Sequence, residues 1–194
     1  MTPNDKILKF LEKNDFITLS EAEALGMSKM ALSRLVLAGI LHKPAKRIYS
    51  KKINWLTEPL AQYAPACSLY PDAVICGISA LIYYGLTDEF ERKIWLAFPR
   101  EHRVHNRDYR IVSLSGQSYS LGIEKHKIGN RIVKIYDVEK TVVDAFKFLP
   151  IDVAHKALRA YLKLKKKNIS KLSTYARQLR KPLHETITIL LSDE

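Results

Sequence analysis

The stretch from residue 16 to residue 50 constrains the fold of this chain more than any other part, because it predicts two short helices separated by a sharp turn. It reads FITLSEAEALGMSKMALSRLVLAGILHKPAKRIYS. Ser20 followed by Glu23 has the spacing of a capping box, which predicts the start of the first helix. Gly26 is expected to end that helix, since the residue past a helix end often adopts a positive φ. A second helix is expected to start directly afterwards, with Ser28 as its cap.

This second helix is predicted to run to about Ala38 and to have two unlike faces. Its apolar residues, Leu32, Leu35 and Val36, recur at helical spacing. The opposite face carries Lys29, Met30, Ser33 and Arg34. Gly39 is expected to close the helix, and a basic β-hairpin is predicted to follow.

The order of these elements predicts a winged helix-turn-helix. In that arrangement the second helix enters the major groove of DNA and the hairpin, or wing, lies along the backbone. We expect the preceding helix, 3–14, to pack behind it and the short strand 16–18 to pair with the wing. The residues expected to contact DNA are Ser28, Lys29, Met30, Ser33, Arg34, Lys43, Lys46, Arg47 and Lys51. Lys and Arg neutralise phosphates, and on the helix they also pair with guanine edges.

Length and charge extend this prediction to the whole chain. At 194 residues it is too long for one winged helix, so we expect two domains, 1–55 and 56–194. The net charge is +12. Residues 1–60 contribute ten Lys/Arg minus six Asp/Glu, or +4, and the rest contributes 22 minus 14, or +8. Because both parts are basic, a polyanionic partner is favoured.

The sequence also indicates where the protein works. It contains no apolar run of 18 residues and its N-terminus lacks an apolar signal core, so we expect a cytoplasmic protein with no membrane partner. Its two cysteines, Cys67 and Cys76, form no CxxC pair and are expected to be free buried thiols.

The second part of the chain predicts an α+β fold. Residues 50–71 read as a connection that packs on other elements. Helices are expected at 73–86, 138–148, 153–167 and 171–181, with Asp72, Asp137, Asp152 and Ser170 as caps. The last segment, 182–194, is expected to be a helix, with a strand as the alternative because of its β-branched content. Strands are expected at 93–99 and 109–115, with two more between 121 and 137 around a turn at Gly129-Asn130. The predicted fold class is therefore α+β, with an N-terminal winged helix-turn-helix domain and a mixed α/β C-terminal domain that ends in a helical bundle.

A basic, amphipathic helical pair stands out near the C-terminus. Between Val153 and His184 there is no Asp or Glu. The apolar residues keep helical spacing, which places the cations on an outer face. This face is either a solvated surface or a second contact, with nucleic acid or with an acidic or RNA-bound partner.

Signals for catalysis or a bound metal are weak. Asp72, Glu91 and Lys93 match the spacing of a PD-(D/E)xK nuclease, but Asp72 is better explained as a helix cap. His102 and His105 lie in a predicted loop without a third zinc ligand nearby. No phosphate-binding or dinucleotide-binding glycine motif is present. We therefore expect no catalytic residue, no metal ligand, no cofactor and no enzymatic activity.

Two further motifs give the chain a family resemblance. They are Ser79-Ala80-Leu81…Gly85-Leu86-Thr87, and Tyr136-Asp137…Lys140-Thr141-Val142-Val143-Asp144. With the predicted helix-turn-helix, the chain resembles AbiEi, the antitoxin and transcriptional regulator of AbiE-type (type IV) toxin–antitoxin and abortive-infection systems. Arg47 stands where many members have a glycine.

The resemblance implies a double function. It implies repression of the protein's own promoter at inverted repeats in double-stranded DNA, and neutralisation of a nucleotidyltransferase-like toxin without a stable complex. The residues assigned to the antitoxin surface on this basis are Lys156, Arg159, Lys163, Lys165, Lys166, Lys167 and Lys171. Two alternatives remain open: a winged helix that targets a nuclease or phosphotransferase domain to DNA, and a transcription regulator that senses a ligand.

Overall fold

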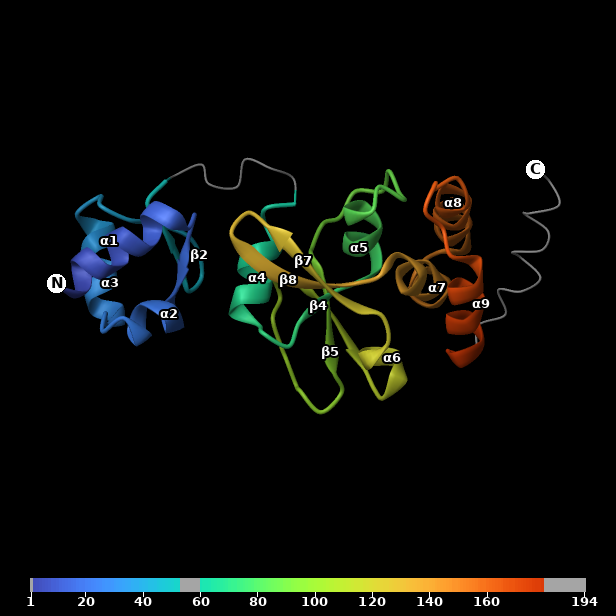
Figure 1. Cartoon of the computed structure of the whole chain (residues 1–194). Helices are drawn as coiled ribbons and strands as arrows, with labels where there is room; N and C mark the ends of the chain where they lie inside the picture. The colour runs from blue at the N-terminus through green and yellow to red at the C-terminus, as the bar shows by residue number, and fades with distance from the viewer. Residues whose placement is uncertain (1, 53–59, 180–194) are drawn as a thin grey trace. The chain divides into compact units, whose positions relative to one another are not determined.

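The computed structural model describes residues 2–52 and 60–179 and has an α+β fold with two separate sheets (Figure 1). Contacts divide these residues into two compact units. The first unit comprises the described residues up to Pro71 together with Lys127–Val133, and the second comprises the remaining described residues. The expected domain boundary near residue 55 and the expected helix at 182–194 lie outside the described residues.

The first unit contains four helices and a three-stranded antiparallel sheet among its described residues. In chain order they are α1 (Pro3–Lys13), β1 (Ile17–Thr18), α2 (Leu19–Ala24), α3 (Lys29–Leu37), β2 (His42–Ala45), β3 (Ile48–Ser50) and α4 (Tyr63–Leu69). The strand order is β1-β3-β2, so the predicted strand before the first short helix does pair with the hairpin. Helix α4, in the stretch interpreted as a connection, was not predicted.

One apolar core holds α1, α2 and α3 of the first unit against its sheet. Ile7 from α1, Leu32 from α3 and Tyr49 from β3 belong to a single buried cluster. Burial of such side chains contributes about 1.5–3 kcal/mol each. The core therefore fixes which face of α3 points inward and which faces solvent.

The cap of α2 differs from the prediction. Thr18, not Ser20, is the N-cap: its hydroxyl accepts from the Glu21 N–H, and the Glu21 carboxylate accepts from the Thr18 N–H at 2.8 Å. The helix starts two residues early because strand β1 ends at Thr18 and the chain turns directly into the helix. Gly26 ends the helical turn with φ +88, as predicted, and Ser28 caps α3.

The second unit is built on a mixed sheet whose strand order is β6-β5-β4-β8-β7. Its elements are β4 (Val74–Ile75), α5 (Gly77–Tyr83), β5 (Trp95–Pro99), β6 (Arg110–Leu114), α6 (Gln117–Ser120), β7 (Ile123–Ile128), β8 (Arg131–Tyr136), α7 (Val138–Phe148), α8 (Ile151–Leu162) and α9 (Ile169–Gln178). Of β7 and β8, the residues next to their shared turn, Lys127–Val133, belong to the first unit. Strand β4 pairs antiparallel with β5 and parallel with β8. The four strands predicted between 93 and 137 are all present, whereas α6 was not predicted.

The predicted helix at 73–86 is wrong in its first part. Val74 and Ile75 form β4 and pair with β5 and β8, and the helix begins only at Gly77. Asp72 is therefore not a helix cap. The β-branched Val74-Ile75 pair fits a central strand, and its neighbours in the sheet override the apolar pattern that predicted a helix.

Two caps near the C-terminus also differ. Helix α8 begins at Ile151 after Pro150, so Asp152 lies within its first turn, and α9 is capped by Asn168 rather than Ser170. Asp137 caps α7 as predicted. Helices α5, α7, α8 and α9 share one buried cluster. No helix among the described residues is long and apolar enough to cross a membrane.

Candidate nucleic-acid interface

One face of helix α3 is exposed to solvent, and it is the face that the sequence predicted to be polar. Leu32 and Leu35 are buried, whereas Met30, Arg34 and Leu37 are exposed. The Ser28 hydroxyl accepts from the Ala31 N–H at 3.2 Å, which fixes the start of the helix. Lys29 and Ser33 are also exposed.

The Ser33 hydroxyl donates to the Lys29 carbonyl at 3.0 Å. Its proton is thus engaged in the helix, and only its oxygen lone pairs remain for a ligand. Ser33 is therefore a weaker candidate for base contact than its exposure suggests.

The charge of this region is uniform in sign. Residues 28–52 contain seven Lys/Arg and no Asp or Glu. They are Lys29, Arg34, Lys43, Lys46, Arg47, Lys51 and Lys52, and all seven are exposed. Within the described part of the chain none of them forms an ion pair, so their charges are available to an anionic partner.

The turn of the β2–β3 hairpin projects two of these cations. Ala45 pairs with Ile48, which leaves Lys46 and Arg47 at the turn. Arg47 adopts φ +65, a conformation that favours glycine. Its carbonyl accepts from the Leu19 N–H at 2.9 Å, which ties the hairpin to the start of α2. The arginine side chain remains exposed.

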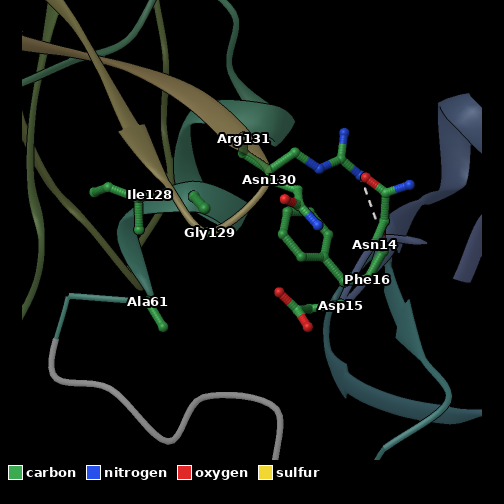
Figure 2. Close-up of a pocket in the computed structure, with 9 residues that line it drawn as sticks. Asn14, Asp15, Phe16, Ala61, Ile128, Gly129, Asn130 and Arg131 are labelled. Carbon is green, nitrogen blue, oxygen red and sulfur yellow. Dashed lines mark hydrogen bonds between the residues drawn. The ribbon is translucent and has the colours of Figure 1, made fainter. Parts of the chain in front are cut away.

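Sequence reasoning missed an arginine that supports α2 inside the first unit. The Arg131 guanidinium forms an ion pair with Glu21 and donates to the Phe16 carbonyl at 2.9 Å. It also lies 4.5 Å from the centre of the Phe16 ring, beside which Figure 2 shows it. Burial raises the pKa of the Glu21 carboxyl, but hydrogen bonds from Arg131 and Thr18 outweigh this effect and hold the pKa below its usual value. No local sequence signal could have found a contact 110 residues apart along the chain.

The cations assigned to the antitoxin surface fall into two groups. Five are exposed on α8 or just after it, namely Lys156, Arg159, Lys163, Lys165 and Lys166. The other two make internal contacts, although Lys167 is also exposed. Lys167 donates to the Leu162 carbonyl at the end of α8, and Lys171 lies 3.1 Å from the Asp137 carboxylate and 3.2 Å from that of Glu139.

The Tyr136–Asp144 motif forms a buried polar network. Lys140 is fully buried and forms an ion pair with Asp144, while its ammonium lies 4.4 Å from the centre of the Tyr136 ring. Asp137 accepts from Tyr175 at 3.0 Å, and Glu139 accepts from Tyr161 at 3.0 Å. These side chains satisfy one another, so the motif residues hold the second unit together.

The residues with nuclease spacing do not meet. The register of β4 with β5, in which Val74 lies opposite Ala97, puts Asp72 beside the end of β5 at Pro99. Lys93 lies two residues before the other end of that five-residue strand, so the full length of the strand, roughly 13 Å, lies between the two. Asp72 instead lies 3.4 Å from His102, and Glu91 accepts from Ser79. No group of three or more His, Cys, Asp or Glu side chains in the described residues is arranged to hold a metal ion.

Cys67 and Cys76 are both buried, as predicted, and no disulfide joins them in the described part of the chain. Burial raises the pKa of the Cys76 thiol well above its ordinary value, which keeps it protonated and unreactive.

No protein-family model and no curated protein matches this chain.

Proposed function

We propose that this protein is a DNA-binding transcriptional autorepressor that also acts as the antitoxin of a type IV toxin–antitoxin system. The observation that carries the proposal is the exposed, acid-free surface of residues 28–52, which presents seven cations around one helix and one hairpin. The second function rests on the AbiEi resemblance and on the exposed cations of α8.

Helix order and exposure support the DNA-binding part. Helices α2 and α3, followed by the β2–β3 hairpin, have the order of a winged helix-turn-helix, with α3 as the helix that enters the major groove. Arg34 points outward from α3 and is the candidate for a bidentate contact with guanine. Lys43, Lys46 and Arg47 on the hairpin are placed to neutralise phosphates. We propose inverted repeats in the protein's own promoter as the site.

The antitoxin part is assigned to the second unit. Lys156 and Arg159 on α8 and Lys163 at its C-cap recur at i, i+3 and i+7, and Lys165 and Lys166 follow directly. An exposed basic edge of this kind suits an anionic partner, such as an RNA or an acidic protein surface. We propose that through it the protein counters a nucleotidyltransferase-like toxin without forming a stable complex with it.

We further propose that the protein acts by binding rather than by catalysis. The separation of Asp72 from Lys93 by the length of β5 supports this view over a nuclease site. The buried charges of α7 also support it, because Lys140 and Asp144 are engaged with each other.

The DNA-binding part is tested with the duplex that lies directly upstream of the protein's own reading frame. We expect the wild type to bind it in a gel-shift titration, and we expect Arg34→Ala to cost about 1–3 kcal/mol of affinity, as loss of a base contact does. Ser33→Ala should cost less, since its hydroxyl proton stays on the Lys29 carbonyl.

Arg92→Ala serves as a matched control, because it removes an exposed arginine from the second unit. Equal affinity for wild type, Arg34→Ala and Arg92→Ala, with unchanged melting temperatures, would remove α3 from the proposed interface.

A further inference from the structure

Two large apolar side chains of α3 face solvent instead of the core. Met30 is 70% exposed and Leu37 is 88% exposed. They occupy positions i and i+7 of the helix, with Arg34 between them at i+4, so the three share one stripe of its surface. Single exposed apolar residues need no explanation. Two of them that flank an exposed arginine form a surface with both apolar and cationic character.

The surroundings of this stripe identify the kind of partner that fits it. No acidic residue occurs between Ser28 and Lys52, and the cations there form no ion pair among the described residues. The partner must therefore offer negative charge and a small apolar group within reach of one helix. The major groove of DNA offers both, because phosphates line it and the 5-methyl group of thymine is the apolar group that its base edges display.

We propose that Met30 is a specificity-determining residue that reads the 5-methyl group of a thymine in the operator. This inference rests on the proposed DNA-binding function and adds a base preference to it. Met30 is the second residue of α3, and the N-terminal residues of a recognition helix are those that contact base edges. Its unbranched thioether adapts its shape to the surface that it meets.

Leu37 provides an internal comparison at the other end of the same stripe. At 1.5 Å per residue it lies about 10 Å further along the helix, or roughly three base pairs of 3.4 Å each. It is the last residue of α3, at the end of the helix that lies away from the base edges. Met30 and Leu37 thus have similar chemistry and exposure but different expected roles.

The experiment removes a single methyl group from the DNA. The operator is first selected from a random duplex pool with wild-type protein, and each thymine of the selected site is then replaced by uracil, which lacks only that methyl. Wild type should lose about fourfold in affinity at one thymine in each half-site, the effect of exposing one methyl group. Met30→Ala and Met30→Gln should bind the thymine operator more weakly and should no longer distinguish uracil from thymine at that position.

Leu37→Ala is the matched control, and it should show the same loss of affinity as the wild type when the thymine is replaced by uracil. Since Met30 and Leu37 are exposed, these variants should melt like the wild type. The inference is overturned if wild type tolerates uracil at every position, or if Met30→Ala shows the same loss as wild type at the same thymine. It is also overturned if Met30→Ala lowers self-association in sedimentation without DNA while leaving uracil discrimination intact. If the pool yields no enriched sequence, the proposed DNA-binding function itself fails. Failure of the Met30 inference alone would leave an enriched operator that is bound without discrimination of uracil from thymine by Met30.

Discussion

At position 122 the backbone adopts φ +72 directly beside the buried network of α7. A Cβ atom at Gly122 would lie 2.8 Å from an oxygen of the Asp137 carboxylate and 2.9 Å from the Lys140 Cβ. The Gly122 carbonyl accepts a hydrogen bond from the Asp137 N–H at 2.7 Å. This one glycine therefore permits both the turn into β7 and the close approach of the α7 cap.

Replacing Gly122 by alanine should destabilise the protein strongly. The left-handed conformation alone costs a non-glycine residue about 1–2 kcal/mol. Overpacking of this kind adds about 1–3 kcal/mol. Gly85→Ala is the matched control, since Gly85 adopts φ +66 but has no atom within 4 Å of the added Cβ. Thermal melting followed by circular dichroism should show a much larger loss for Gly122→Ala, and equal losses would contradict the steric account.

The ion pair of Glu21 with Arg131 makes a second residue-scale prediction, which concerns pH. The pKa of folded Glu21 lies below its ordinary value of 4.5, so the carboxylate stabilises the fold above that pH. This contribution is lost as the pH falls through the folded pKa. Glu21→Gln should therefore lower the melting temperature by a few degrees at pH 7, corresponding to about 1 kcal/mol, and by much less near pH 3.

Glu23→Gln provides the control in the same helix, because Glu23 is exposed and forms no ion pair with a described residue. Its substitution should have little effect at either pH. A Glu21→Gln deficit that stays constant from pH 7 to pH 3 would show that the charge of Glu21 does not matter.

At the scale of elements, the basic region after α7 combines two kinds of lysine. Lys171 lies between the nearly buried carboxylates of Asp137 and Glu139, and these partners raise its pKa despite the opposing effect of burial. Its charge thus joins α9 to the start of α7. The cations of α8 are exposed and form no ion pair with another described residue.

We therefore expect a loss of stability from one variant and almost no change from another. Lys171→Gln should cost about 1–2 kcal/mol, because it leaves buried carboxylates without a cationic partner. The triple variant Lys163→Gln, Lys165→Gln and Lys166→Gln should melt close to the wild type, as exposed substitutions usually do. Thermal melting of both proteins checks this, and a triple variant that melts below Lys171→Gln would contradict the assignment.

At the scale of the whole molecule, the proposal assigns two functions to two surfaces. Lys29→Ala with Arg34→Ala should abolish promoter repression and leave protection against the toxin intact. The triple variant of Lys163, Lys165 and Lys166 should lose protection against the toxin and keep promoter repression. If these lysines also contact DNA, its DNA binding should depend less on salt. The measurements are a promoter–reporter assay and growth during co-expression with a nucleotidyltransferase-like toxin, both with the full chain. Loss of both activities in either variant, with normal melting, would refute the division of labour.

Local patterns predicted much of the first unit. The 3.6-residue spacing of apolar residues gave α1 and α3, and the turn residues gave Gly26, Ser28 and the β2–β3 hairpin. In the second unit, the sequence predicted four strands that correspond to β5 to β8, and Asp137 predicted the start of α7. The same patterns predicted that Arg34 and the basic hairpin are exposed. Residues that recur at a fixed helical or strand period share one face, and the polar face lies opposite the buried apolar one.

What the sequence could not determine depends on partners far away in the chain. Val74-Ile75 became a strand because β5 and β8 lie on either side of it, and Thr18 replaced Ser20 as the cap because β1 pairs with β3. Lys171 became a structural residue because α9 packs on the start of α7. Helix and turn signals are short-ranged along the backbone, whereas strand pairing and buried ion pairs gain their energy from residues that only the folded chain brings together.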